Sequence, residues 1–316
     1  MAGGQERILK RRIRSIKATQ KITRAMELIA ASQIVRAQNR IAAGIAYQQG
    51  IARVLAEAAA DAGQNAGRLL GAADDPRRVL LLAIVGDRGL AGGYNTNVLR
   101  TVERIVSAGR QSGVEHRVVT AGKKGPSYLR FRGFDVAEAF TGFSDRPTFD
   151  DARRLAGALT PAFLDEEVDQ VLVVSTRYLS AGSQVVETRQ LLPLPEPGPG
   201  TGEPGTGERR APAGDETAPA AAPGGSGGYT EFEPDSTDIL ADLVPRYVEA
   251  AVFGALLEAA AAFFTAQQRA MAAATDNADD LAKSLTRVMN RARQDAITTE
   301  IMEIVGGAEA LRQAAE

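Results

Sequence analysis

The chain has 316 residues, 44% of them apolar, and a formal net charge of −2, so it can build one or two domains with a real core, and as a whole it is neither a polyanion binder nor strongly acidic. It contains no Cys and a single His, His116, which excludes thiol catalysis, disulfides and cysteine-rich zinc sites and disfavours a histidine-based metal site. We therefore expect no metal and no cofactor, and we interpret His116 as a polar residue at the start of a strand.

Residues 5–60 predict a first long helix. Its apolar side chains recur at roughly helical spacing, at Ile13, Ile16, Ile22, Met26 and Ile29. A basic flank covers the rest of its first part: Arg7, Lys10, Arg11, Arg12, Arg14, Lys17, Lys21 and Arg24. Such a flank is typical of a solvated face, of a nucleic-acid surface, or of a basic rod that faces an acidic protein. No nucleic-acid module follows it, which disfavours the second interpretation.

Residues 77–192 alternate between strands and helices. The pattern predicts strands over 79–85, 117–120, 134–140, 168–175 and 184–191, and helices over 96–108, 126–132 and 150–159. The first strand is a continuous apolar run, as expected where both faces of a strand are buried. This alternation predicts a mostly parallel sheet with helices on its faces, that is, a Rossmann-like α/β domain.

A glycine-rich loop follows the first strand over residues 86–93 and contains Gly86, Gly89, Gly92 and Gly93. Loops at this place bind phosphates in many α/β sheets. This loop lacks both the Gly-x-Gly-x-x-Gly spacing and the Gly-Lys-Ser/Thr ending of nucleotide-binding loops. We interpret it as a structural turn whose glycines permit positive φ or a close approach of a long helix. We also find no nucleophile, base and orienting residue in a recognisable arrangement, so we expect no catalytic residue.

The C-terminal part reads as a low-complexity insertion followed by one very long helix. Residues 193–230 are rich in Pro, Gly, Ala, Glu and Thr, which predicts a disordered surface insertion. Residues 236–316 predict a helix about 120 Å long at 1.5 Å per residue. Its apolar or small stripe contains Leu281, Leu285, Val288, Ala292, Ala296 and Thr299. Residues 247–266 are apolar, but they are mostly Ala and include Glu249 and Glu258, which disfavours a membrane span.

The expected architecture is α/β, with a long antiparallel coiled coil of the N- and C-terminal helices and a Rossmann-like globular domain. The predicted divisions are an N-terminal coiled-coil helix over 1–72, the α/β domain over 77–192, the insertion over 193–230 and the C-terminal coiled-coil helix over 236–316. A two-helix rod buries little surface by itself, so its exposed apolar residues near the ends require an enclosing partner. A stiff shaft attached to a globular part suits mechanical coupling better than catalysis.

Three stretches carry a resemblance to a known family. The C-terminal ITTEIMEIVGGAEA has the signature of that family at Ile297, Thr298, Glu300, Glu303, Gly307, Ala308 and Ala310. Residues 12–32 resemble its opening helix, and residues 86–97, GDRGLAGGYNTN, resemble its loop after the first strand. The chain thus resembles the gamma subunits of bacterial rotary proton-translocating ATP synthases over nearly its whole length. The insertion is longer than that family leads us to expect. With the Ala- and Arg-rich composition, it suggests an actinobacterial type.

The resemblance implies a central rotor shaft that couples proton-driven rotation of the membrane c-ring to ATP synthesis in a ring of alpha and beta subunits. The chain itself would be non-catalytic and would bind the alpha, beta and epsilon subunits and the c-ring at the cytoplasmic face of the membrane. It would bind no nucleic acid and no small-molecule substrate. The resemblance assigns the signature residues to rotor–stator contact, Met26 to coupling, and the basic flank to acidic loops of the ring. The alternatives are a nucleotide-binding α/β enzyme with helical arms and a coiled-coil nucleic-acid binder.

Overall fold

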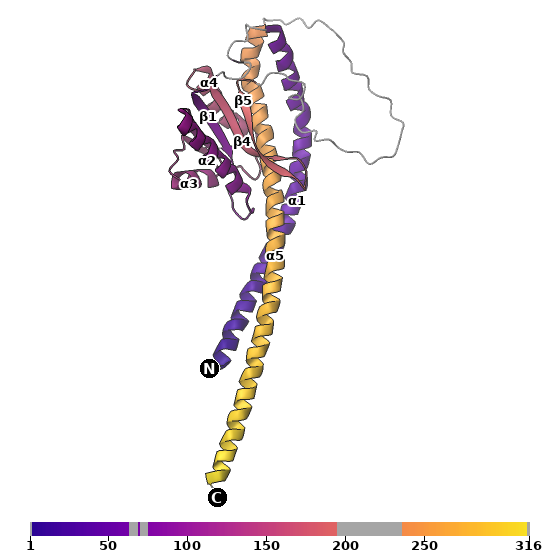
Figure 1. The fold of residues 1–316 in the computed structure, drawn as a ribbon. Coiled ribbons are helices and arrows are strands. Elements are labelled where there is room, and N and C mark those ends of the chain that lie inside the picture. The colour runs from indigo at the N-terminus through magenta and orange to yellow at the C-terminus, as the bar shows by residue number, and fades with distance from the viewer. Residues whose placement is uncertain (1, 63–68, 70–74, 195–235, 315–316) are drawn as a thin grey trace, which may run out of the picture. The chain divides into compact units, whose positions relative to one another are not determined.

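The computed structural model describes residues 2–62, 69, 75–194 and 236–314. Along the chain lie α1 (Ala2–Ala62), β1 (Arg78–Ile84), α2 (Tyr94–Ser112), β2 (Glu115–Ala121), α3 (Lys124–Phe131), β3 (Glu138–Phe140), α4 (Phe149–Leu164), β4 (Gln170–Tyr178), β5 (Gln184–Leu192) and α5 (Ser236–Ala314) (Figure 1). The α/β class with two long terminal helices, predicted from the sequence, is confirmed. Most of the predicted insertion, residues 195–230, lies outside the described part.

Residue contacts divide the chain into two compact units, and the boundary between the units runs through both long helices. We call Met1–Ser32, Leu90–Gly92 and Ala266–Glu316 the helix-pair unit, and Gln33–Gly89 with Gly93–Thr265 the sheet unit. The domain bounds predicted from the sequence instead follow the ends of the helices and strands, and they stay a prediction.

The sheet has the strand order β3-β2-β1-β4-β5. β1 pairs in parallel with β2 and with β4, and β2 pairs in parallel with β3. The edge strand β5 runs antiparallel to β4, so the sheet is mostly parallel, as predicted. The strand predicted over 134–140 is wrong in its first half. Phe134 is buried under α2 and α3, and the ladder with β2 covers only Glu138–Phe140.

Two helical layers cover the sheet because successive side chains of a strand point to opposite faces. On β1, Leu81, Ala83 and Val85 face α2 and α3 and form one core with them. Leu80 and Leu82 face the other side. There α4 and the parts of α1 and α5 that belong to the sheet unit pack together, and the Phe149 ring lies 5.6 Å from that of Phe253.

Burial also explains the hydropathy of α5. Among the described residues, α5 contains the one helical segment that is long and apolar enough to cross a membrane, within Ile239–Ala308. In its most apolar stretch, 72% is buried inside the protein. In the sheet unit, Val252, Leu256 and Ala259 of α5 belong to the core on the sheet.

In the helix-pair unit, α1 and α5 run antiparallel. Thr23 Oγ1 lies 2.7 Å from Thr275 Oγ1, and Gln20, earlier in α1, donates to Asp279, later in α5, at 3.2 Å. On each helix a series of buried and half-buried positions steps by four and three residues, the 3.5-residue repeat of a coiled coil. On α1 these are Leu9, Ile13, Ile16, Gln20, Thr23, Glu27 and Ala30, and on α5 they are Met271, Thr275, Ala278, Ala282, Leu285, Met289, Ala292 and Ala296.

This seam corrects the two apolar stripes predicted from the sequence. Ile22 and Ile29 are 60% and 59% exposed, and Leu281, Val288 and Thr299 are exposed as well. Of the predicted stripes, Ile13, Ile16, Leu285, Ala292 and Ala296 do lie in the seam. The contact also includes small and polar residues that the stripes left out, such as Thr23, Ala30 and Ala282, which let two helix backbones approach closely.

Candidate functional site

The family-signature residues lie together on the last turns of α5, and those whose side chains the structure describes are exposed. Every residue from 297 to 308 is exposed, which includes Ile297, Thr298, Glu300, Glu303, Gly307 and Ala308. Ala310 lies in the same helix, but its side chain is outside the described part of the structure. Figure 1 shows the yellow end of α5 continuing past the N-terminal end of α1, which explains this exposure.

Large apolar side chains are conspicuous on this unpaired end. Ile297, Ile301, Met302, Ile304 and Val305 are all exposed, Ile304 at 72%. Ile297, Ile301 and Ile304 follow one another at steps of four and three, so they share one face of the helix. A contiguous exposed apolar face of this kind marks an interaction surface.

The basic flank is also fully presented to the outside. Its eight residues, Arg7, Lys10, Arg11, Arg12, Arg14, Lys17, Lys21 and Arg24, are all exposed. Arg24 forms an ion pair with Glu27 at 2.9 Å, one turn further along α1. Met26, between them, is half-buried. On α5, hydrogen bonds from Lys283, one turn later, and from Gln20 across the seam lower the pKa of Asp279. Exposed cations in this number attract an acidic surface over a Debye length.

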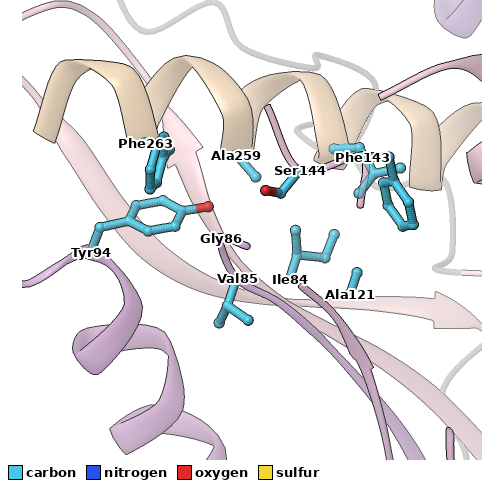
Figure 2. Close-up of a pocket in the computed structure, with 10 residues that line it drawn as sticks. Ile84, Val85, Gly86, Tyr94, Ala121, Phe143, Ser144, Ala259 and Phe263 are labelled. Carbon is cyan, nitrogen blue, oxygen red and sulfur yellow. The ribbon is translucent and has the colours of Figure 1, made fainter. Parts of the chain in front are cut away.

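The sheet unit has the topology in which α/β proteins bind nucleotides. Such ligands lie beyond the carboxyl ends of the strands where the strand order reverses, here between β1 and β4. In this protein α5 fills that place, with Ala259 and Phe263 facing Gly86 and Tyr94 (Figure 2). A cavity of about 10 Å³ remains, enough for about one water molecule. Burial raises the pKa of the enclosed Tyr94 hydroxyl.

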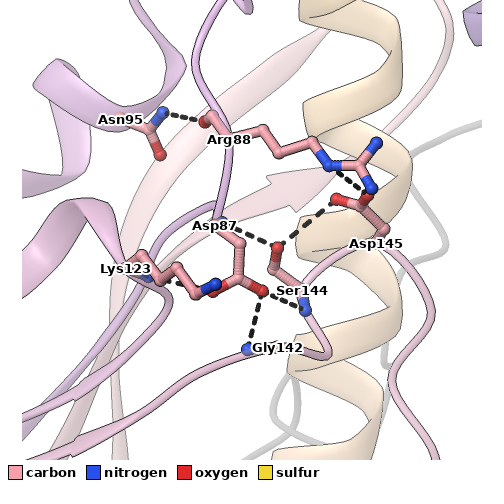
Figure 3. A network of polar contacts seen from close by, with 7 residues as sticks. All are labelled: Asp87, Arg88, Asn95, Lys123, Gly142, Ser144 and Asp145. Atoms are coloured by element: carbon pink, nitrogen blue, oxygen red, sulfur yellow. Dashed lines mark hydrogen bonds and ion pairs between the residues drawn. The ribbon is translucent and has the colours of Figure 1, made fainter.

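The loop after β1 is tied to the loops after β2 and β3 through one carboxylate (Figure 3). Asp87 accepts hydrogen bonds from the backbone amides of Lys123 at 3.0 Å, Gly142 at 3.0 Å and Ser144 at 3.1 Å. Its own amide donates to Ser144 Oγ at 2.8 Å. Burial raises the pKa of Asp87, but these donors outweigh it and the net pKa is lowered. The ionised Asp87 therefore links the three loops through hydrogen bonds.

The four glycines of this loop have different surroundings. A Cβ on Gly86 would lie 3.0 Å from Cε2 of Phe263, so here the long helix approaches closely. Gly92 has φ of +55°, and a Cβ there would lie 3.8 Å from that of Ala270. Gly89 has a nearest neighbour at 3.9 Å, and Gly93 has φ of −82°. The sequence did not reveal that Leu90 takes a positive φ of 62°.

His116 lies near the start of β2, where its ring packs on α2. A Cβ on Gly109 would lie 2.0 Å from Cε1 of His116, so the glycine makes room for the ring. Burial lowers the pKa of His116, while a contact with the Val114 carbonyl acts against this. Among the residues that the structure describes, no group of three or more His, Cys, Asp or Glu side chains is arranged to hold a metal ion.

A family model described as ATP synthase matches residues 5–311. The chain is 44% identical to the ATP synthase gamma chain of Parafrankia sp. strain EAN1pec, over 99% of each chain. It is also 44% identical to the gamma chain of Frankia casuarinae, over 98% of each. The gamma chain of Acidothermus cellulolyticus is 43% identical, again over 98% of each. These relatives come from actinobacteria, as the composition suggested.

Solved structures share the fold. A chain of the Euglena gracilis mitochondrial ATP synthase, in a structure of OSCP, F1 and c-ring in rotational state 3, aligns with a TM-score of 0.66 over 99% of this chain and 97% of that chain, at 16% identity. A chain from the central stalk and c-ring of the Tetrahymena thermophila enzyme aligns with a TM-score of 0.58 over 80% of this chain and 99% of that chain, at 20% identity.

Proposed function

Because the chain belongs to the gamma-chain family of ATP synthase, we propose that it is the central rotor shaft of the proton-translocating enzyme. In this role it couples rotation of the membrane c-ring to ATP synthesis in the ring of alpha and beta subunits. Its partners are the alpha and beta subunits, the epsilon subunit and the c-ring. It works at the cytoplasmic face of the membrane as a peripheral part of the complex.

The observation that carries this proposal is the unpaired, apolar end of α5. Ile301 and Ile304 lie on the last turns of α5, where every described residue from 297 to 308 is exposed, and each presents a large aliphatic side chain. Burying one such side chain is worth roughly 1.5–3 kcal/mol. An enclosing collar of other subunits supplies that burial without restricting rotation, since aliphatic contacts are non-directional.

The basic flank suits a rotating contact for a related reason. Its charges are exposed, and an attraction between exposed charges is long-ranged and weak at any single pair. Acidic loops of the alpha–beta ring can therefore attract the shaft at many angles without locking it at one. In this proposal Met26, Glu300 and Glu303 face the ring and transmit torque rather than transfer protons.

We further propose that the chain is itself non-catalytic and binds neither a small-molecule substrate nor nucleic acid. Two features of the sheet unit support this. Phe263 and its neighbours on α5 occupy the place where related α/β folds hold a nucleotide, and a nucleotide pocket needs roughly 300 Å³ or more. Asp87, in the loop after β1, already accepts hydrogen bonds from three backbone amides.

Co-purification tests the proposal. The full chain is tagged in its own host membranes, and wild type is compared with Ile301→Asp/Ile304→Asp and with the exposed control Gln294→Asp. We expect wild type and control to recover alpha, beta, epsilon and c subunits with ATPase activity, and the isolated chain to show none. The double variant should lose alpha and beta subunits, because two buried carboxylates cost several kcal/mol. Full recovery with the double variant would refute the enclosed-shaft model.

A further inference from the structure

A broad concavity opens on the side of the sheet unit opposite α5. It has a volume of about 690 Å³, and its walls come from α2, from the residue that follows α3, and from β5. It is lined by Asn97, Arg100, Thr101, Glu103, Arg104, Ser107, Arg132 and Val186. We call it the arginine cleft. Its lining includes no residue of the glycine loop over 86–93 and none of the family signature, although Asn97 lies beside Gly93.

The charge of the arginine cleft is positive because only one of its arginines is neutralised from within. Arg132 forms an ion pair with Glu103, and Tyr128 donates its hydroxyl to the same carboxylate at 3.0 Å. The hydrogen bond from Arg132 lowers the pKa of Glu103, so this carboxylate stays ionised and occupied. Arg100 and Arg104 lie four residues apart, on one face of α2, and both are exposed.

The chemistry around the cleft is that of a protein interface. Phe131, next to Arg132 at the end of α3, is 86% exposed, more than any other large apolar side chain that the structure describes. Arg and aromatic residues are the types enriched at protein interfaces. The cleft is wide and its arginines are exposed, whereas a small-molecule site encloses most of its ligand. Guanidinium groups form bidentate pairs with carboxylates and phosphates, and on a protein partner the carboxylates of Asp and Glu supply such groups.

We propose that the arginine cleft is a docking surface for an acidic segment of a partner protein, with Arg100 and Arg104 pairing with its Asp or Glu side chains. The inference rests on the proposed function, because it requires a partner within the assembled complex. It adds a place and a chemistry: the contact lies on the α2–α3 side of the sheet, opposite α4 and the sheet-unit parts of α1 and α5.

The absence of cysteine from the chain makes a direct test practicable. Ser107→Cys places one thiol in the cleft, and Ser112→Cys places one on the same helix outside it. Each full-length variant is labelled with a cysteine-linked photo-cross-linker in the purified complex, and cross-linked peptides are identified by mass spectrometry. We expect position 107 to cross-link to an Asp/Glu-rich peptide of another subunit at least fivefold more than position 112.

Charge reversal supplies the second arm. Arg100→Glu/Arg104→Glu should reduce the cross-link from position 107 at least tenfold, and Arg36→Glu/Arg53→Glu, an equal reversal of two exposed arginines on α1, should not. Exchanging the Asp and Glu residues of the cross-linked peptide for Lys should restore the cross-link in the Arg100→Glu/Arg104→Glu variant. If the intact complex gives no cross-link, gives one to a peptide without acids, or shows only protection of the thiol by inorganic phosphate, this inference fails and the shaft proposal stands. Failure of the wild-type chain to co-purify with any subunit overturns both.

Discussion

Gly86 and Phe263 compete for the same space: a Cβ built on Gly86 would lie 3.0 Å from Cε2 and 3.1 Å from Cδ2 of the Phe263 ring. Gly86, two residues after β1, therefore leaves room for α5, which lies directly upon it. This contact converts the place where a doubly wound sheet accepts a nucleotide into packed core.

Gly86→Ala should therefore destabilise the protein by about 1–3 kcal/mol, the usual cost of overpacking a core. Gly89→Ala is the matched control, since its nearest neighbour would lie 3.9 Å away, and it should stay within about 0.5 kcal/mol. Urea unfolding of both variants measures the difference. In the double variant Gly86→Ala/Phe263→Leu, the smaller side chain should relieve the clash. Additive costs would show that the two residues do not interact.

Asp87→Asn should lower the free energy of unfolding by about 1–3 kcal/mol, because an amide cannot accept all the hydrogen bonds that the carboxylate accepts. The folded-state pKa of Asp87 is lowered, so its contribution is present above the unfolded pKa and is lost as pH falls through the folded pKa. Unfolding curves at neutral pH and in mild acid should show the gap between wild type and variant closing in acid. Asp135→Asn, at an exposed carboxylate, is the control. An equal loss of unfolding free energy in that variant would contradict the role of Asp87 in linking the loops.

Glu258 of α5 should give the opposite pH dependence. Burial raises the pKa of Glu258, and the ion pair with Arg189 at 3.1 Å lowers it. The effect of burial is the larger one, so the net pKa is raised. A raised pKa means that the folded state binds the proton more tightly, so this contribution to stability falls as pH rises from the unfolded pKa to the folded one. Each unit of displacement corresponds to about 1.4 kcal/mol.

The test compares urea unfolding of wild type and Glu258→Gln from about pH 4 to about pH 8, around the unperturbed carboxylate range. The difference in unfolding free energy between wild type and variant should change over that pH range, because Gln cannot ionise. Glu57→Gln, at an exposed site on α1, serves as control. If Glu258→Gln leaves a difference that is constant with pH, Glu258 does not titrate abnormally.

Two isoleucines of α1 test the seam of the helix pair. Ile13 is buried and Ile22 is 60% exposed, although both were assigned to one apolar stripe. Ile13→Ala should cost about 2 kcal/mol, at the low end for a buried aliphatic residue, and Ile22→Ala less than about 0.5 kcal/mol. Thermal unfolding of the isolated full-length chain reports both. Equal losses would mean that the helices meet along the predicted stripe instead.

The sequence alone determined the α/β class, the two long helices, the mostly parallel sheet and the family. These follow from local signals: residue periodicity, glycine and proline breaks, a buried apolar run in β1, and the signature from Ile297 to Ala310. It also indicated that the glycine loop is not a phosphate-binding loop, because the required spacing is missing. The roles of the signature residues and of Met26 in rotor–stator contact stay predictions.

Tertiary structure alone decided which residues meet. Ile13 and Ile22 are nine residues apart, about 180° around a helix, so one stripe could not hold both. Which of the two faces forms the seam depends on the facing helix, here on Thr275 and Ala282. Phe263 packs on Gly86, and Asp87 links three loops, so both contacts join residues that are far apart in the chain. So does the arginine cleft between α2, Arg132 and β5. Such contacts leave no local pattern, because the energy that selects them comes from packing and charge between elements that only the fold brings together.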